Sequence, residues 1–265
     1  MSGPPARVVD GMERYQGAFK DDRRHGKGTC IFPDGSRYTG EWSHGAVEGE
    51  GRFEHANGDI FVGRLTNRRR VHGKLSWANG DEYEGEFGGH DAPNGTGTMH
   101  YAAQKVVHAG LWAEGVPSGS GERRELSVGA IRRGIFRGDR LEGEGEEILP
   151  GDAADAAADG DAAAANDASG VRHGRSRRLN GLVSGVTSGG VGVAERYVGT
   201  FADGVRHGHG SLEVATGPSW RGAWTVRWEG HFEAGDLGTE CHSFVERAAD
   251  GSEVRAPLTA PRLLP

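Results

Sequence analysis

Apolar and polar side chains alternate along most of the chain, and the alternation restarts at short, regular intervals. In the first clear case, Tyr15, Gly17 and Phe19 hold every second position. Residues 26–32 repeat this pattern, with glycine, cysteine and phenylalanine at alternate positions. A period of two residues is the signature of a β-strand. The pattern therefore predicts strands that come in pairs.

A five-residue motif with a central glycine, flanked two positions away by mostly aromatic residues, recurs along the chain. The first six copies lie 23, 23, 22, 25 and 24 residues apart, and the last two are again 23 residues apart. Self-similarity at a fixed period of this size indicates a repeat architecture. The central glycines are Gly17, Gly40, Gly63, Gly85, Gly110, Gly134, Gly199 and Gly222.

Two further signatures keep the same phase. One is a turn sequence, Pro33-Asp34-Gly35 in the first repeat and Asn-Gly in the next two, whose residues tolerate turn dihedrals. The polar segment Lys20–His25 is predicted to join the two strands of the first repeat, so that each repeat forms one β-hairpin. The other signature is Gly-x-Gly, with Val71 replacing the first glycine of the third copy: Gly26/Gly28, Gly49/Gly51, Gly95/Gly97, Gly119/Gly121, Gly143/Gly145 and Gly208/Gly210.

The glycines share a strand face with aromatic residues. Because glycine weakens a strand, aromatic rings are expected to lie across the bare backbone of glycines on neighbouring strands. Such rings would form a thin core in which each hairpin depends on its neighbours. The predicted repeat core comprises Tyr15, Gly17, Phe19, Gly28, Tyr38, Gly40, Trp42, Gly51, Gly63, Tyr83, Gly85, Phe87, Gly97, Trp112, Tyr197, Gly199, Phe201, Trp220, Trp224 and Trp228.

The segment Tyr15–Arg37, YQGAFKDDRRHGKGTCIFPDGSR, resembles the MORN consensus (membrane occupation and recognition nexus) nearly residue for residue. The resemblance covers about residues 10–150 and 197–235. It is loosest in the fifth and sixth copies, where Val107 or His108 and Ile131 or Arg132 occupy the aromatic start. It implies an all-β fold: an elongated, twisted antiparallel sheet of consecutive hairpins in one solenoid-like layer. With strands ~4.8 Å apart, six repeats would span roughly 60 Å.

The repeat pattern is interrupted after residue 151. An Ala/Asp-rich run without large apolar residues follows, which predicts disorder. A basic run, 172–178, is either a docking or nuclear-import patch or a solvated linker, and we favour the linker. The chain is predicted to divide into a segment with a partial repeat (1–14), an array of about six repeats (15–151), a linker with a degraded repeat within 171–196 (152–196), a second block of repeats with a cap (197–240) and an irregular tail (241–265).

Residues 220–232 alternate without interruption, with Trp220, Trp224 and Trp228 on the same side. The repeat period fails here, since Gly230 follows Gly222 by only eight residues. We interpret this segment as an atypical terminal repeat that caps the array. A Trp-lined groove for a partner is the alternative.

Composition narrows the function classes. Only 35% of the 265 residues are hydrophobic, 47 are glycine, and the formal net charge is −7. A negative charge argues against nucleic-acid binding, which needs a basic surface. Two cysteines make no disulfide framework and fit a reducing compartment. With no signal-peptide pattern at its start and no long apolar stretch, the chain is expected to be soluble and cytoplasmic.

The sequence contains no recognisable catalytic motif. Gly26-Lys27-Gly28 lacks the spacing of a phosphate-binding loop, and no Gly-x-Ser-x-Gly elbow occurs. Cys30 falls on the inward side of its strand, which favours a small core residue over a nucleophile. The 12 histidines form no compact cluster with cysteine. We therefore expect no enzyme activity, no cofactor and no metal site.

Two basic triplets are the candidate contact residues, because both fall in the same predicted inter-strand loop of their repeats. They would form a basic rim for a protein partner or for anionic lipids such as phosphoinositides, although a merely solvated rim is the simpler interpretation. We expect a scaffold or adaptor that binds protein partners; a peripheral membrane module and a regulator of an enzyme in trans are alternatives, and homodimers through free sheet edges are plausible. The MORN resemblance implies cytoskeletal or ciliary assemblies. The triplets are Arg23, Arg24, His25 and Arg68, Arg69, Arg70.

Overall fold

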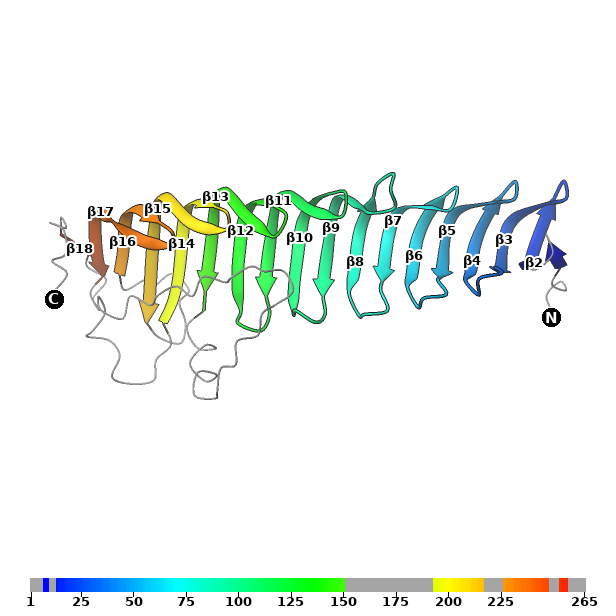
Figure 1. The fold of residues 1–265 in the computed structure, drawn as a ribbon, viewed down its shortest axis with the longest axis horizontal. Coiled ribbons are helices and arrows are strands. Elements are labelled where there is room, and N and C mark those ends of the chain that lie inside the picture. Colours follow the sequence, from blue (N-terminus) through cyan, green and yellow to red (C-terminus); the bar gives the residue numbers. More distant parts are fainter. Residues whose placement is uncertain (1–6, 10–12, 151–192, 217–225, 248–252, 257–265) are drawn as a thin grey trace. The chain divides into compact units, whose positions relative to one another are not determined.

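The computed structural model describes residues 7–9, 13–150, 193–216, 226–247 and 253–256. These residues form β-strands and turns, which confirms the predicted all-β class of consecutive antiparallel hairpins (Figure 1). Contacts divide the chain into two units, Met1–Gly119 and Ser120–Pro265. The described residues form no helix that could cross a membrane.

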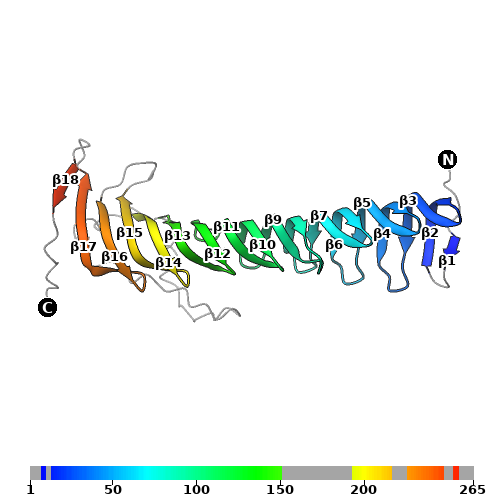
Figure 2. The ribbon, with the colours of Figure 1, turned by 90° about the horizontal axis from the view of Figure 1, so that it is seen from above.

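In the first unit, every strand from β1 to β10 pairs antiparallel with the next strand in the chain (Figure 2). The strand β11 (Val116–Glu125) contains the boundary between the units. The strands of this unit are β1 (Arg7–Val9), β2 (Glu13–Lys20), β3 (Arg23–Ile31), β4 (Arg37–Ser43), β5 (Ala46–Glu54), β6 (Ile60–Thr66), β7 (Arg69–Ser76), β8 (Glu82–Phe87), β9 (Pro93–Tyr101) and β10 (Val106–Ala113).

The second unit has the same order of antiparallel pairing. Its β13 pairs directly with β14, with Gly145 opposite Gly199, so strands from the two predicted blocks of repeats are neighbours in the same ladder. The predicted linker and degraded repeat lie in 151–192, outside the described residues. The strands are β12 (Ala130–Arg137), β13 (Arg140–Leu149), β14 (Val193–Ala202), β15 (Val205–Thr216), β16 (Val226–Glu233), β17 (Asp236–Arg247) and β18 (Glu253–Ala256).

The last repeat has a different phase from the predicted one. Gly230 on β16 lies opposite Gly210, and Trp228 lies opposite Leu212. The motif of this repeat is therefore Trp228–Phe232, whereas Trp220 and Trp224 lie outside the described residues. Both segments fit a two-residue period, and only pairing with β15 decides between them. In addition, β17 and β18 extend into the segment expected to be an irregular tail.

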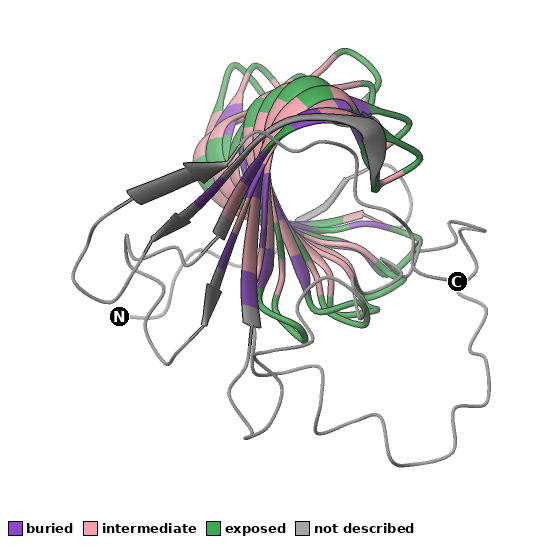
Figure 3. Cartoon of the chain, turned by 90° about the vertical axis from the view of Figure 1, so that its left-hand side faces the viewer, coloured by how far each residue is buried: buried purple, intermediate pink, exposed green. Residues whose placement is uncertain are grey.

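A continuous row of buried side chains crosses the first unit from strand to strand. Members face each other in the strand register, and each is at most 7% exposed. Buried and exposed positions alternate along the strands, as the sequence pattern predicted (Figure 3). This inner row consists of Tyr15, Cys30, Tyr38, Phe53, Phe61, Leu75, Tyr83, Met99 and His108.

Tyrosine rings cover glycines as predicted. A Cβ added at Gly51 would lie 2.6 Å from the Cζ of Tyr38, and one added at Gly40 would lie equally close to the same atom. The Tyr38 hydroxyl also donates a hydrogen bond to the Glu41 carbonyl, at 3.0 Å, where the register between β4 and β5 shifts and Glu41 faces three residues of β5. We call the repeats with this arrangement the tyrosine repeats; they begin with Tyr15, Tyr38, Tyr83 and Tyr197.

The two glycines of Gly-x-Gly have different roles. The second, such as Gly28, lies under a ring. The first, such as Gly26 with φ +67°, is left-handed and faces an aromatic residue of the next repeat, here Trp42. Only glycine adopts that conformation without strain. The prediction that the glycines seat aromatic rings is therefore confirmed for the second glycine of the pair in the tyrosine repeats, whereas Gly145 lies against Leu141.

The fifth and sixth repeats keep the register without tyrosine. His108 and Arg132 occupy the position that tyrosine holds in the tyrosine repeats, two residues before the central glycine. Arg132 pairs with Glu147 at 2.8 Å, and Glu147 also pairs with the buried Arg206 at 2.9 Å. Burial raises the pKa of Glu147, but the two guanidinium groups outweigh it and hold this pKa below its ordinary value. An ion pair thus replaces a ring in the core of the second unit.

Candidate functional site

The third repeat (residues 61–82) departs from its neighbours at four positions. Phe61 replaces tyrosine, Val71 replaces the left-handed glycine, and Arg68 lies in the hairpin turn. Leu65 lies two residues after the central glycine, where the other repeats carry Phe19, Trp42, Phe87, Trp112, Phe136, Phe201 and Phe232.

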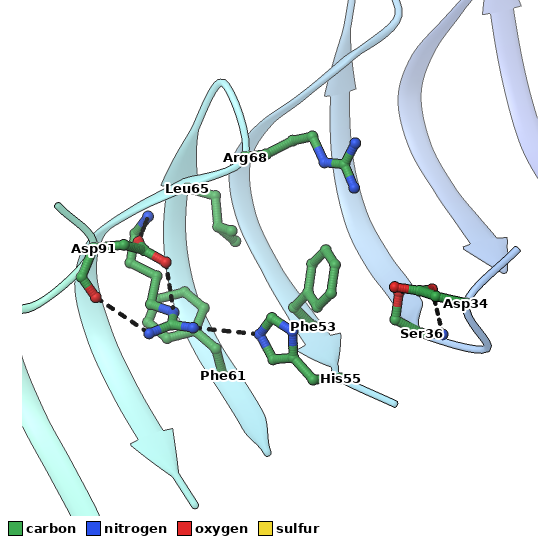
Figure 4. A pocket seen from close by; sticks show the side chains of 9 residues that line it. Asp34, Ser36, Phe53, His55, Phe61, Leu65, Arg68 and Asp91 are labelled. Atoms are coloured by element: carbon green, nitrogen blue, oxygen red, sulfur yellow. Dashed lines mark hydrogen bonds and ion pairs between the residues drawn. The ribbon is translucent and has the colours of Figure 1, made fainter. Parts of the chain in front are cut away.

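A pocket of about 220 Å³ opens beside Leu65 in the first unit (Figure 4). Since Leu65 is smaller than the aromatic residue found at this position in other repeats, the missing ring accounts for the open space. The inner-row residues Phe53 and Phe61 line the pocket with it, and all three side chains are at most 7% exposed. The remaining lining residues come from turns and strand ends: Asp34, Ser36, His55, Arg68, Arg70 and Asp91.

One wall of the pocket is a fixed polar cluster around Arg70. Its guanidinium pairs with the Asp91 carboxylate at 3.4 Å and donates to His55 Nε2, also at 3.4 Å. The Arg70 backbone N–H donates to the same carboxylate at 2.8 Å. The guanidinium carbon also lies 5.7 Å from the ring centroids of Phe61 and Phe87. Arg70 is therefore neutralised and held by its neighbours.

Two titratable groups of the pocket have shifted pKa values. Burial lowers the pKa of His55, and the positive charge of Arg70 lowers it further, so His55 is neutral near pH 7. Hydrogen bonds from Ser36 lower the pKa of Asp34, which remains a carboxylate. The Ser36 hydroxyl donates to Asp34 Oδ1 at 2.5 Å, and the Ser36 backbone N–H donates to it at 2.9 Å. A carboxylate with a lowered pKa is a weak base.

Arg68 differs from Arg70 in its surroundings. It is exposed at the mouth of the pocket, and its guanidinium carbon lies 4.7 Å from the centroid of the Phe32 ring. Among the described residues, no carboxylate lies within ion-pair distance of it. Arg68 also has φ +67°, a left-handed conformation that is costly for a residue with a Cβ. At the same turn position, other hairpins carry Gly45, Gly115, Gly204 and Gly235.

The structure corrects the predicted basic loops. The first hairpin turn contains only Asp21 and Asp22, so the residues from Arg23 to His25 lie in β3. A two-residue turn with two left-handed residues matches the twist of the strands, which allows pairing to continue to the turn. Arg24 points inward, pairs with Glu13 at 2.7 Å and lies over the Trp42 ring. Only one arginine of the first triplet is therefore exposed.

In the second triplet, Arg68 lies in the turn, whereas Arg69 and Arg70 lie in β7. The Arg69 guanidinium donates to the Gly89 carbonyl at 3.3 Å, and its side chain is exposed. Both triplets thus contain one inward arginine, Arg24 or Arg70, fixed by a carboxylate and aromatic rings. The exposed rim consists of Arg23, Arg68 and Arg69.

The pocket combines apolar and charged groups. It offers an apolar floor, one exposed guanidinium and one exposed carboxylate at the rim. Within the described part of the chain, no group of three or more His, Cys, Asp or Glu side chains is placed to hold a metal ion. Cys30 is buried as predicted, and burial raises the pKa of its thiol.

Sequence reasoning singled out Arg68 and Arg70 but missed the rest of the pocket. The signal that could have found it is Leu65, because every other copy of the motif has an aromatic residue two positions after its central glycine. The strand register places His55 and Asp91 at opposite ends of the strands, and the sequence period alone does not show that the side chain of Arg70 contacts both.

Comparisons with known proteins agree with the repeat pattern. The family model described as MORN repeat matches residues 15–37, 38–60, 67–82 and 197–217. In the third repeat the match begins only at residue 67, after the departures at Phe61 and Leu65.

Curated relatives and a solved structure give more distant matches. Alsin from Rattus norvegicus and from Homo sapiens are each 25% identical over 141 residues, 49% of this chain. The match spans 8% of the length of those proteins. A solved structure titled the SAS-4 (dCPAP) TCP domain in complex with a proline-rich motif of Ana2 (dSTIL) of Drosophila melanogaster is similar at 10% identity. The match covers 88% of this chain and 90% of the solved chain, with a TM-score of 0.35.

Proposed function

Because the chain carries MORN repeats, we propose that it is a non-catalytic scaffold that binds protein partners, with the pocket of the third repeat as a docking point. The observation that supports this most is the combination of Leu65 and Arg68. One residue opens an apolar space, and the other places a charge without a carboxylate partner among the described residues at its mouth. Apolar pockets with a few polar groups at the rim are typical binding sites.

Proximity labelling in the native cell, followed by co-precipitation of the labelled proteins, tests this function. The wild-type chain is compared with Leu65→Trp, which fills the pocket, and Leu65→Met, which keeps a similar volume. We expect one or more partners to be lost with Leu65→Trp and kept with Leu65→Met. If the same partners are recovered with all three chains, the pocket is not the docking point; if no partner exceeds the background, the scaffold function itself fails.

Binding to anionic membranes is a second candidate, favoured by the exposed side chains of Arg23, Arg68 and Arg69. Inward placement of Arg24 and Arg70 weakens it, because their charges are neutralised within the fold. Co-sedimentation with vesicles that contain a phosphoinositide separates the candidates. Lipid binding predicts salt-sensitive co-sedimentation that is lost when the three exposed arginines are replaced by glutamate.

A further inference from the structure

Three of the four departures of the third repeat, Phe61, Leu65 and Arg68, line the same pocket. Leu65 removes a ring from the inner face, and Arg68 brings a guanidinium to the opening that this leaves. The other repeats carry an aromatic residue at the first of these positions, and four hairpins carry glycine at the second, where the first repeat has Asp22. A repeat that gives up both a ring and a relaxed turn at one place has the properties of a site maintained for a ligand.

We propose that this pocket takes a peptide segment of a protein partner in which an aromatic side chain adjoins a carboxylate. The inference rests on the proposed scaffold function and specifies the ligand of its docking point. The aromatic side chain would take the place of the ring that Leu65 lacks, against Phe53 and Phe61. The carboxylate would pair with Arg68.

Shape and surroundings support an aromatic group. Rings are the regular occupants of this position in the array, and neighbouring rings pack edge to face, as Tyr38 and Trp42 do with centroids 5.3 Å apart. Phe53 and Phe61 offer ring surfaces to such a contact, and Phe53 already stacks on Phe32 with centroids 5.7 Å apart. Aromatic pairs contribute beyond the area that they bury.

Charge complementarity supports the carboxylate. Of the two arginines that line the pocket, Arg70 is paired with Asp91, which leaves Arg68 as the cation available to a ligand. The Phe32 ring beneath Arg68 orients its guanidinium, so less side-chain freedom is lost on binding. On the other side, the Asp34 carboxylate is exposed and would repel a second acidic residue. This predicts an acidic residue on the Arg68 side of the aromatic anchor only.

The test uses the full chain and a phage-displayed library of random short peptides. We expect enrichment of peptides with an aromatic residue next to Asp or Glu. A representative peptide is then compared with two altered versions, one with the aromatic residue changed to alanine and one with the acidic residue changed to its amide. Each change should weaken binding about tenfold or more, measured by fluorescence anisotropy, since a charge-assisted hydrogen bond contributes roughly that much.

Protein variants separate the two halves of the proposal. Arg68→Gly should weaken the acidic peptide to the level of the amide peptide, and Leu65→Trp should abolish binding of both. The matched control is Asp22→Gly at the equivalent turn position of the first repeat, which has φ +56° and should leave affinity unchanged. Circular dichroism confirms that each variant is folded.

Several outcomes would overturn the proposal. Selection of basic or purely aliphatic peptides, equal affinity for the acidic and amide peptides, or full binding by Arg68→Gly would each do so. If cellular partners still depend on the pocket in those cases, the scaffold function stands and only the ligand class is wrong. Arginine-dependent binding to phosphoinositide vesicles without any peptide enrichment would assign the pocket to a membrane surface instead.

Discussion

The tyrosine repeats and the third repeat show two ways to build a hairpin on the same register. In the second repeat, the Tyr38 hydroxyl bonds to the carbonyl of Glu41, where the strand register shifts, and Gly49 takes a left-handed conformation opposite the next repeat. In the third repeat, Phe61 covers Gly63 and Gly73 but has no hydroxyl, and Val71 alone falls out of the ladder. The extra residues lie on the second strand in both repeats, but three residues of β5 (48–50) face Glu41, whereas on β7 only Val71 is extra.

The difference shows that the consensus positions depend on one another. In the tyrosine repeats, the hydroxyl bonds to the carbonyl of a residue that faces three residues of the second strand, and the middle one of these three is a left-handed glycine. Once Val71 stands in place of that glycine, Arg64 pairs with His72 and the acceptor is no longer offered. The third repeat gives up these interactions together, which leaves room for the pocket.

Alkaline pH should produce the largest difference in stability between the tyrosine repeats and the third repeat. Burial raises the pKa of Tyr38, Tyr83 and Tyr197 to about 12 from an ordinary 10.0. Below pH 10 both folded and unfolded chains keep these protons, so the stabilisation is complete. Between pH 10 and 12 the unfolded chain loses protons first, and the free energy of unfolding falls by about 2 to 3 kcal/mol per tyrosine. Urea denaturation across this range measures the fall.

The third repeat has no such group at Phe61, which supplies the control. Tyr38→Phe should lose less stability across the same pH range than the wild-type chain, while Phe61→Leu should show the wild-type slope from a lower starting value. An equal slope in the wild-type and Tyr38→Phe chains would show that burial of the tyrosine does not govern the alkaline loss.

Gly51→Ala should destabilise the second repeat by about 3 kcal/mol. The added Cβ would lie 2.6 Å from the Cζ of Tyr38, so the ring that covers two strands must move. Gly35→Ala is the matched control, because Gly35 has φ +88° and no atom within 4 Å of an added Cβ. Its cost should be only the backbone strain, about 1 kcal/mol. Similar losses in the two variants, measured by urea denaturation, would contradict the role of the ring.

Tyr38→Phe and Phe61→Tyr test whether the hydroxyl needs its bulge. Loss of the bond to Glu41 should cost about 1 kcal/mol at neutral pH. Phe61→Tyr should give no gain in stability. Arg64 takes the place of Glu41 in this repeat, and it is paired with His72, so its carbonyl is not offered to the new hydroxyl. A gain of comparable size with Phe61→Tyr, measured by thermal unfolding, would show that the two kinds of repeat are interchangeable.

The sequence was sufficient for the period, the hairpins and the rings over glycines, because these depend on residues close together in the chain. Its errors came from register. Trp220 to Trp224 and Trp228 to Phe232 share one local pattern, and only pairing with β15 decides between them. The basic triplets were assigned to a six-residue loop because polarity does not reveal that a two-residue turn carries β3 up to Arg23.

The pocket was harder to predict for the same physical reason. The sequence shows that Leu65 departs from the aromatic pattern. It does not show that side chains from the turns of several repeats surround the space beside Leu65. His55 and Asp91 lie 36 residues apart in the sequence (91 − 55), and Arg70 contacts both. Buried ion pairs such as Arg132 with Glu147 have the same origin, since strand pairing alone makes them neighbours.

Arg68→Gly should have the smallest effect on stability, and unlike the preceding variants it should stabilise the fold. Glycine removes the strain of a left-handed residue at φ +67°, although it also gives the unfolded chain more freedom, so we expect a net gain of about 0.5 kcal/mol. Asp22→Gly should give a similar gain in the first repeat. Both variants relieve the same kind of backbone strain. Arg68→Gly also removes a side chain that lies at the pocket and on the Phe32 ring. Thermal unfolding of both chains measures this difference. If Arg68→Gly is destabilising while Asp22→Gly is stabilising, the contact with Phe32 outweighs the strain, and Arg68 is retained for the stability of the fold rather than for a ligand.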